Sequence, residues 1–378
     1  MINTSVSILF NATNLHGGGG VQVATSFINE LSLILKENVF HKTKFFVACS
    51  STVFNNLPAE FDFSPFDQFV VFDLYGFTKN VQKCDVLLNH YDYCFTIFGP
   101  VYFNVKALCH IVGFAQPWIA YPNSAAYYKV DFYTRLKFRL KYFVQKVLFT
   151  RYDLLVVEQE NVKSALVSIG FSEEKVKIVS NTISSVFFNK QLWEKVTKPH
   201  QLDCSHKTLG FLGRAYPHKN LEILINVDYI LKKKYGLEFN FIFTLDEEDM
   251  NRLGFAALSN FHSVGPIKAS QCPTFYQMID GLIFPSLLEC FSATPIEAMY
   301  MRIPVFASDL PFIRSVCQES VYYFNPLDAG SIADTIIFGF NDFNLDNKLE
   351  AGVGIVDSLP TANQRAVAYL SLIKELEG

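Results

Sequence analysis

The sequence predicts an α/β protein that contains two parallel β-sheets, each covered by helices. Short β-rich runs alternate with amphipathic helical segments, which is the pattern of successive βα units. The alternation lapses once near the middle and then restarts, and a chain of 378 residues is long enough for two domains. Hydrophobic residues make up 50% and charged residues 18% of the chain, a composition that excludes an intrinsically disordered protein.

The first half is expected to form a Rossmann-like domain over residues 1–183. An amphipathic segment from Val21 to Lys36 predicts a helix directly after the first strand. The expected strands are SVSILF from Ser5, FFVACS from Phe45, FVVFDL from Phe69, DVLLN from Asp85, KALCHI from Lys106, DLLVVE from Asp153 and VKIVS from Val176.

A second Rossmann-like domain is expected over residues 208–360. Residues 184–207 are polar and turn-prone, with no clear period, and are interpreted as a linker. A helix is predicted from Leu221 to Lys233. A C-terminal helix is expected over 361–378, with helical spacing of its apolar residues from Thr361 to Glu377. This helix can pack against either half and can cross back to the first domain. The expected strands are TLGFLG from Thr208, FNFIFTL from Phe239, DGLIFPS from Asp280, IPVFAS from Ile303 and VYYF from Val321.

The net charge and the cysteine pattern limit the classes of partner and cofactor that we expect for this protein. The formal net charge of −4 is too close to neutral for a general nucleic-acid binder, so no nucleic-acid partner is expected. The eight cysteines form no CxxC pair and lie mostly in apolar runs, which is typical of reduced thiols in a cytoplasmic protein. No D-x-D motif or cluster with metal-ligand spacing occurs, so we expect neither a metal nor a cofactor. Met1–Leu9 shows no basic region before its apolar stretch, and no signal peptide is predicted.

The first expected strand runs into four consecutive glycines, Gly17 to Gly20, at the point where a helix begins. Glycine permits close approach of the backbone, and a helix N-terminus offers unpaired N–H groups, so the loop suits a diphosphate. The dinucleotide fingerprint G-x-G-x-x-G fails here because its third glycine is replaced by Gln22 or Val23, which disfavours NAD. A tight strand-to-helix turn without a ligand is the alternative.

The second half opens in the same way, with TLGFLGRAYPHKN. Gly213, Arg214 and Lys219 follow a strand and precede a helix. Two cations beside a helix N-terminus can neutralise a diphosphate, the arginine through a planar fork and the lysine as a point charge. The alternative is a pair of solvated surface cations.

Two glutamates eight residues apart mark the segment FPSLLECFSATPIEAM. Thr294-Pro295-Ile296-Glu297 predicts a helix start in which Thr294 is the N-cap and Glu297 closes a capping box. Glu289 lies before that helix, in the loop after the strand GLIFPS, which is where ligands bind in open α/β sheets. A capping role is therefore the alternative for Glu297, while Glu289 is a candidate ligand-binding carboxylate.

Five segments occur in a fixed order along the chain: the glycine loop, GRAYPHKN, VGPI from Val264, the E-x7-E pattern from Glu289 to Glu297, and IPVFAS. In this ordered set the chain resembles the retaining GT-B-fold glycosyltransferases of the family-four type. The resemblance covers nearly the whole chain. It implies two Rossmann-like domains that face each other across a cleft. It also implies a hexosyltransferase-type transfer from a nucleotide-sugar donor to a glycan acceptor, in bacterial surface-polysaccharide (O-antigen or capsule) synthesis, where many such acceptors are lipid-linked.

The resemblance also implies roles for individual residues. Arg214 and Lys219 would hold the donor diphosphate, and Glu289 would bind the transferred sugar. Glu297 would bind the ribose. The implied donor site comprises Gly18, Gly19, Arg214, Lys219, Val264, Glu289, Phe291, Ser292 and Glu297.

By the same resemblance, the catalytic set is His110, Arg214, Lys219 and Glu289. His110 would face the transferred sugar, and Gln116 and Trp118 would contact the acceptor. The chain departs from the family pattern where glycines are common, at Cys290, Ser292 and Ile303, which leaves the donor sugar open. A nonhydrolysing nucleotide-sugar epimerase and a non-catalytic sugar-nucleotide binding protein remain alternatives.

The segment from Lys129 to Arg151 is strongly basic. Its only acid is Asp131, and a helix here would place Leu136, Leu140, Phe143 and Val147 in one apolar stripe. We expect this stripe to dock onto the first domain and the cations to point outward, either as a solvated face or toward an anionic membrane surface on the cytoplasmic side. The seven cations are Lys129, Arg135, Lys137, Arg139, Lys141, Lys146 and Arg151.

Overall fold

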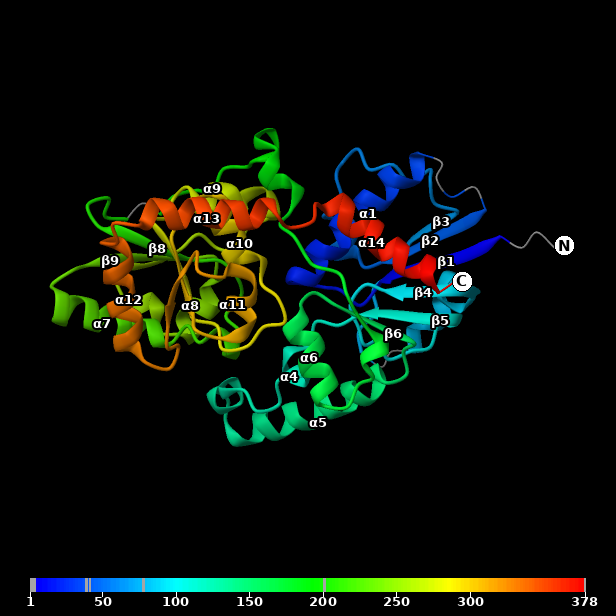
Figure 1. The fold of residues 1–378 in the computed structure, drawn as a ribbon, viewed down its shortest axis with the longest axis horizontal. Helices are drawn as coiled ribbons and strands as arrows, with labels where there is room; N and C mark the ends of the chain where they lie inside the picture. The colour runs from blue at the N-terminus through cyan, green and yellow to red at the C-terminus, as the bar shows by residue number, and fades with distance from the viewer. Residues whose placement is uncertain (1–4, 38–39, 41, 77–78, 200–201, 377–378) are drawn as a thin grey trace. The chain divides into compact units, whose positions relative to one another are not determined.

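The computed structural model describes residues 5–37, 40, 42–76, 79–199 and 202–376 (Figure 1). The chain folds into two compact units. Unit 1 comprises Met1–Ala120, Lys137–Thr182 and Pro360–Gly378, and unit 2 comprises Tyr121–Leu136 and Ile183–Leu359. The segment Tyr121–Leu136, which lies between two parts of unit 1 in the sequence, therefore groups with unit 2, and nothing in the local sequence pattern predicts this.

Unit 1 is built on a seven-stranded parallel sheet of order β3-β2-β1-β4-β5-β6-β7. The strands are β1 Val6–Ala12, β2 Thr43–Cys49, β3 Gln68–Val71, β4 His90–Thr96, β5 Lys106–Gly113, β6 Leu154–Val157 and β7 Val176–Ile178. The helices are α1 Gly19–Lys36, α2 Ser51–Phe54, α3 Asp85–Leu88, α4 Pro117–Ala120, α6 Glu160–Ser168 and α14 Ala362–Glu375, with α5 Phe132–Phe149 continuing into unit 1 from Tyr121–Leu136.

Unit 2 is built on a six-stranded parallel sheet of order β10-β9-β8-β11-β12-β13. The strands are β8 Lys207–Phe211, β9 Phe239–Phe243, β10 Phe261–Ser263, β11 Gly281–Phe284, β12 Val305–Ser308 and β13 Tyr322–Phe324. The helices are α7 Ile223–Tyr235, α8 Glu247–Arg252, α9 Cys272–Tyr276, α10 Ala293–Tyr300, α11 Pro311–Cys317, α12 Ala329–Phe340 and α13 Leu345–Asp357. The predicted α/β class with two parallel sheets is confirmed.

One expected strand of unit 1 is wrong. DVLLN from Asp85 forms the short helix α3, with Asp85 in its first turn, and the strand is the next segment, His90–Thr96. A short apolar run fits a strand and a buried helical turn equally well, so periodicity alone could not separate them. The polar Asp92 in the true strand is satisfied across the sheet, because its carboxylate accepts hydrogen bonds from the N–H and the hydroxyl of Ser7, both at 2.7 Å.

The C-terminal helix α14 belongs to the core of unit 1. It packs beside α1, as the red and blue helices of Figure 1 show. Tyr369 lies edge-on to Phe27 and to Phe95, with ring centroids 5.4 and 5.1 Å apart. Thr361 and Gln364 form a capping box at its start. The predicted end at Glu377 lies outside the described residues.

Helix α5 is oriented opposite to expectation. Its buried side chains are Gln145 and Phe149, whereas Leu136, Leu140, Phe143 and Val147 are exposed. The apolar stripe therefore does not dock onto the sheet. Aromatic side chains on the other face, Phe138 and Tyr142, pack against Trp118 instead.

No helix among the described residues is long and apolar enough to cross a membrane.

Arg365 is the polar link that holds α14 in unit 1. Its guanidinium is 2% exposed and donates to Ser26 Oγ at 2.9 Å and to Asn181 Oδ1. It also lies near the buried carboxyl of Glu158. Burial raises the pKa of Glu158 to about 7, and the charge of Arg365 opposes that rise.

We predict that Arg365→Met lowers the free energy of unfolding by about 3 to 5 kcal/mol, because it removes the guanidinium that binds the buried Asn181 and that stabilises the charge of the buried Glu158. Urea denaturation measures this. Arg302→Met, which breaks the surface pair with Glu350, is the matched control and should change stability by less than about 1 kcal/mol. Equal effects of the two variants would contradict the assigned role of Arg365.

Candidate active site

In each sheet successive strands are added outward from a central strand, first on one side and then on the other. The change of direction creates a topological switch point between two central strands. In unit 2 these strands are β8 and β11, and in unit 1 they are β1 and β4. Ligands of open α/β sheets bind outside the carboxyl ends of the strands at this point. The loops after β8 and β11, and those after β1 and β4, are therefore the places to look for chemistry.

In unit 2 the switch point holds a buried ion pair. Lys219, the last residue of the 3-10 helix Pro217–Lys219 after β8, donates from Nζ to Oε1 of Glu289 in the loop after β11. Both side chains are 12% exposed. Ser286 Oγ donates to the same carboxylate oxygen at 2.7 Å, and Lys219 Nζ lies 5.1 Å from the ring centroid of Phe284. The structure thus brings together two of the predicted residues, Lys219 and Glu289.

Main-chain hydrogen bonds lock the two loops together. The carbonyl of His218 accepts the N–H of Leu287 at 2.7 Å, and Ser286 Oγ, whose proton points to Glu289, lies 3.4 Å from the same carbonyl oxygen. Burial lowers the pKa of the His218 imidazole to about 4, with Lys219 adding to the effect and Glu289 opposing it, so the ring is neutral at pH 7. Sequence reasoning missed both Ser286 and His218, although each stands next to or near a predicted site residue.

Arg214 is the unpaired cation of this site. It follows Gly213, whose φ of 146° lies in the region that favours glycine. Its side chain is exposed, and no hydrogen bond or ion pair joins its guanidinium to any described residue. An anion that reaches these loops therefore meets a cation that no described carboxylate neutralises.

Glu297 has a different environment from Glu289. It is 5% exposed on α10, and the hydroxyl of Tyr276 donates to its Oε2 at 2.9 Å and to the carbonyl of Thr294 at 3.0 Å. Burial raises the pKa of Glu297 to about 7, and the Tyr276 hydrogen bond lowers it in part.

The predicted capping box is wrong. Helix α10 begins at Ala293 with Ser292 as its N-cap, which makes no side-chain capping bond, and Thr294 and Pro295 already lie inside the helix. Glu297 instead satisfies its carboxylate through Tyr276, on α9, and no local pattern could predict a partner from another helix.

The remaining donor-site candidates are spread over two places in unit 2. Phe291 and Ser292 directly precede α10, where a helix leaves backbone N–H groups unpaired. Val264 follows β10, an outer strand of the sheet, and its N–H binds the carbonyl of Phe243 at 3.0 Å. The structure places Phe291 and Ser292 beside the Glu289 loop and leaves Val264 at the end of an outer strand.

In unit 1 the switch point holds a cavity of about 390 Å³. It is lined by loops after β1, β3, β4 and β5 and by Gln145 of α5, and its lining residues include no Asp, Glu, Lys or Arg. His16 stacks on Tyr75 with ring centroids 3.9 Å apart and binds the carbonyl of Leu74 through Nε2 at 2.8 Å. The polar lining residues are Asn14, His16, Tyr75, Tyr102, Gln116 and Gln145.

The four glycines of the glycine loop have different surroundings. Gly17 and Gly20 line the cavity, and a Cβ on Gly20 would meet Leu15 and Phe98 at 3.4 Å. Gly18 has a φ of 72° and is the N-cap of α1, while a Cβ on Gly19 would meet nothing within 4 Å. Gly18 is therefore required by the turn, and Gly19 opens to free space.

The three other candidate site residues of unit 1 lie in different surroundings. Gln116 lines the cavity. His110 lies within β5, its N–H binds the carboxylate of Asp153 at 2.8 Å, and it is not among the lining residues. Trp118 is 6% exposed and packs against Phe138 and Tyr142 of α5. Packing against α5 accounts for the burial of Trp118.

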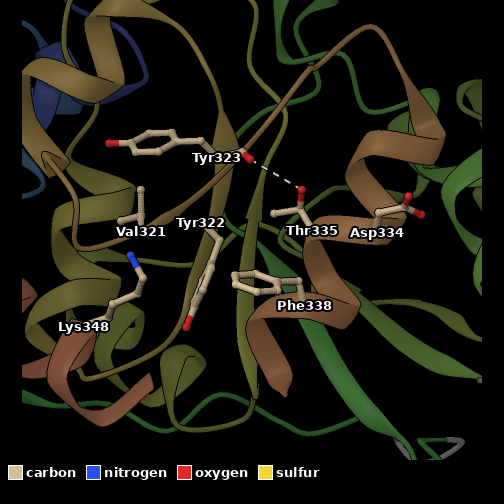
Figure 2. A pocket seen from close by; sticks show the side chains of 7 residues that line it. All are labelled: Val321, Tyr322, Tyr323, Asp334, Thr335, Phe338 and Lys348. Atoms are coloured by element: carbon tan, nitrogen blue, oxygen red, sulfur yellow. Dashed lines mark hydrogen bonds between the residues drawn. The ribbon is translucent and has the colours of Figure 1, made fainter. Parts of the chain in front are cut away.

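A second hollow, in unit 2, is lined by β13, α12 and α13 (Figure 2). Its charged groups are already engaged: Asp334 accepts hydrogen bonds from Lys234 and Tyr235, and Lys348 binds the carbonyl of Glu319. It lies at the outer strand β13, away from the switch point. We therefore do not assign it to the active site. Within the described residues, no group of three His, Cys, Asp or Glu side chains has the arrangement of a metal site.

Comparison with known proteins agrees with this architecture. Residues 194–352 match the family model "Glycosyl transferases group 1". The O-antigen chain mannosyltransferase RfbU of Salmonella typhimurium is 26% identical over 221 residues, 54% of this chain and 55% of RfbU. The capsular polysaccharide biosynthesis glycosyltransferase CapM of Staphylococcus aureus is 25% identical over 186 residues, 46% of this chain and 48% of CapM. The chain spans about half the length of the curated relatives it matches.

Solved structures match over nearly the full length. Sucrose-phosphate synthase from Thermosynechococcus elongatus has a TM-score of 0.67 at 15% identity, covering 98% of this chain and 99% of that one. Anabaena Alr3699/HepE in complex with UDP-glucose has a TM-score of 0.63 at 16% identity, covering 97% and 99%. At these identities the likeness establishes the fold. The expected GT-B fold and the expected resemblance are thus confirmed: the chain has the GT-B fold, and its residues 194–352 match the model of the glycosyl transferases group 1 family.

Proposed function

We propose that this protein is a retaining glycosyltransferase that moves a hexose from a nucleotide-sugar donor to a glycan acceptor in bacterial surface-polysaccharide synthesis. The observation that carries the proposal is the exposed Arg214 in the same loop as Lys219, whose buried pair with Glu289 lies at the switch point of the unit that matches the glycosyl transferase family. The names of RfbU and CapM support the polysaccharide context.

The donor diphosphate is proposed to bind at the loops after β8 and β11. With His218 neutral, this site holds the two cations Arg214 and Lys219 and the one carboxylate of Glu289, a net positive charge that attracts a diphosphate. The N-terminus of α10, preceded by Phe291 and Ser292, adds a positive dipole end.

Transfer breaks the bond between the anomeric carbon and the diphosphate oxygen and forms a bond from that carbon to an acceptor hydroxyl oxygen. Arg214 and Lys219 are proposed to stabilise the negative charge that develops on the leaving diphosphate. The acceptor proton passes to a departing phosphate oxygen, on the face that the leaving group vacates, which gives retention. Glu289 is proposed to bind hydroxyls of the transferred sugar, and Glu297 the ribose. His110 is proposed to face the transferred sugar, a role for which the cavity geometry adds no support.

The acceptor is proposed to be a glycan that binds in unit 1. The cavity at the glycine loop offers amide and hydroxyl groups together with aromatic rings and no fixed charge, which suits sugar hydroxyls better than a phosphate. Gln116 is the predicted acceptor residue that lines it. A lipid-linked glycan is the proposed form of the acceptor, and the protein is proposed to work on the cytoplasmic side of the membrane.

A nonhydrolysing epimerase and a non-catalytic binding protein are separated from a transferase by incubating the protein with nucleotide sugars and candidate acceptors. We expect release of nucleoside diphosphate only when an acceptor is present, and no loss of this activity in EDTA, because cations of the protein are proposed to replace a metal. An altered sugar still attached to its nucleotide would identify an epimerase. Binding without turnover would identify the non-catalytic protein, and metal-reversible inactivation would contradict metal independence.

Arg214→Ala and Lys219→Ala should each reduce kcat/KM by an amount equivalent to about 2 to 4 kcal/mol, the usual loss for one preorganised electrostatic group. Steady-state kinetics with the donor found in the screen measures this. Lys233→Ala removes a cation from the exposed side of α7 in the same unit and should leave kcat/KM unchanged. Near-wild-type kinetics of Arg214→Ala would refute the donor site proposed here.

The two glutamates should behave differently. Glu289→Gln should nearly abolish kcat, because its carboxylate holds both Lys219 and the sugar, whereas Glu297→Gln should mainly raise the donor KM. A similar loss of kcat in both variants would show that these roles are misassigned.

The raised pKa of Glu297 also predicts how stability depends on pH. Because the folded pKa of about 7 exceeds the ordinary 4.5, its contribution to stability is complete at low pH and is lost as pH rises through 7. Glu297→Gln should remove a pH-dependent loss on the order of 3 kcal/mol between pH 4 and 8. Urea denaturation across this range, compared with wild type, tests it; unchanged slopes would contradict the raised pKa.

A further inference from the structure

Helix α5 exposes a broad apolar face that no described part of the chain covers. Within unit 1 this face, the α5 apolar face, consists of Leu140, Phe143, Val144 and Val147, which are 65, 64, 39 and 44% exposed. At about 100° per residue these four side chains fall within an arc of about 100°. The same arc continues toward the start of the helix through Leu136 and Tyr133, and Phe132 lies about 20° beyond its edge; all three are exposed.

Cations flank the α5 apolar face on both sides. By the same helical spacing, Lys137 and Lys141 lie along one edge of the arc, and Arg139 lies along the other. Lys146 lies farther round the helix and donates to the carbonyl of Ile169 at 2.7 Å. The helix contains five Lys or Arg residues and no acidic residue. Asp131, just before its start, is occupied as a cap by the N–H groups of Tyr133 and Thr134.

The opposite face of α5 anchors the helix to unit 1. Phe149 packs on Phe114 with ring centroids 4.8 Å apart, and Tyr142 stacks on Trp118 at 5.8 Å. Gln145, on the same face, is 5% exposed and donates to the hydroxyl of Tyr102 at 2.7 Å. The helix is therefore held in place by one face, while the apolar residues of the other face remain in water, an arrangement that marks an interaction surface.

We propose that α5 docks in the plane of an anionic lipid surface, with its apolar face inserted at the level of the acyl chains and its flanking cations on the headgroups. An apolar arc between two cationic edges is the arrangement of an interfacial helix. The cations at its edges, on a helix that contains no acid, complement the negative potential of anionic lipids. A second copy of this chain fits poorly, because pairing two such faces would bring the cationic edges of both helices together.

The inference rests on α5 and does not depend on the proposed reaction. The proposed docking differs from electrostatic attraction of a basic helix face alone, because the apolar side chains leave water when the helix docks. Part of the binding should therefore persist at high salt, where attraction between exposed charges is screened.

The test is sedimentation of the full chain with vesicles of phosphatidylcholine, with and without phosphatidylglycerol. Leu140→Ser/Phe143→Ser should weaken binding to the anionic vesicles at least about tenfold, because two apolar side chains are lost from the inserted face. The matched control is Leu327→Ser/Phe338→Ser, which changes two side chains of unit 2 with 57 and 62% exposure and should bind as wild type does. Lys137→Glu/Lys141→Glu should reduce binding to anionic vesicles and leave the weak binding to neutral vesicles unchanged.

Three results would overturn the proposal. They are failure of wild type to bind anionic vesicles at low salt, wild-type binding by Leu140→Ser/Phe143→Ser, and a wild-type dimer in lipid-free solution that this variant converts to a monomer. The last result would assign the face to a second copy of the chain. If the double variant does not fold, Phe143→Trp keeps the proposal testable: brominated lipids should quench its emission beyond the quenching seen in wild type, and equal quenching would overturn insertion.

Discussion

The ion pair between Lys219 and Glu289 is the constraint on which the candidate donor site depends. Two charges that are each 12% exposed persist only if they are paired and hydrogen-bonded, and Ser286 supplies the additional hydrogen bond. The pair holds the loops after β8 and β11 in one arrangement, with the carbonyl of His218 as a second tie between them. It also neutralises one of the two cations, so that Arg214 is left as the uncompensated charge for the diphosphate that we propose to bind here.

The two units share one kind of sheet topology but differ in the charge of the loops at the switch point. Each sheet has its switch point between two central strands, but the loops there differ in charge. In unit 2 they carry Arg214, Lys219 and Glu289, whereas in unit 1 they enclose a cavity without fixed charge. A diphosphate favours the first environment and sugar hydroxyls favour the second. The proposed division into donor and acceptor sites rests on this difference in side-chain chemistry on one shared architecture.

Helix α5 shows how burial decides what an amphipathic pattern means. Its sequence contains one apolar stripe and several cations, and local spacing alone favours an inward apolar side. In the structure a different set of side chains faces inward, with Phe149 and Tyr142 packed against aromatic residues of unit 1. The apolar stripe that remains outside is the surface that we propose to enter a lipid environment, because exposure of several large apolar side chains to water is unfavourable.

The sequence by itself determined the α/β class, the two sheets and the strand-loop-helix positions of Arg214, Lys219 and Glu289, because strand periodicity and loop glycines act over a few residues. Only the tertiary structure decided that Lys219 pairs with Glu289, 70 residues away, and that Glu297 is held by Tyr276 rather than by a capping box. It also decided which face of α5 is covered. These outcomes depend on which distant segments pack together, and a local pattern of residues carries no information about that.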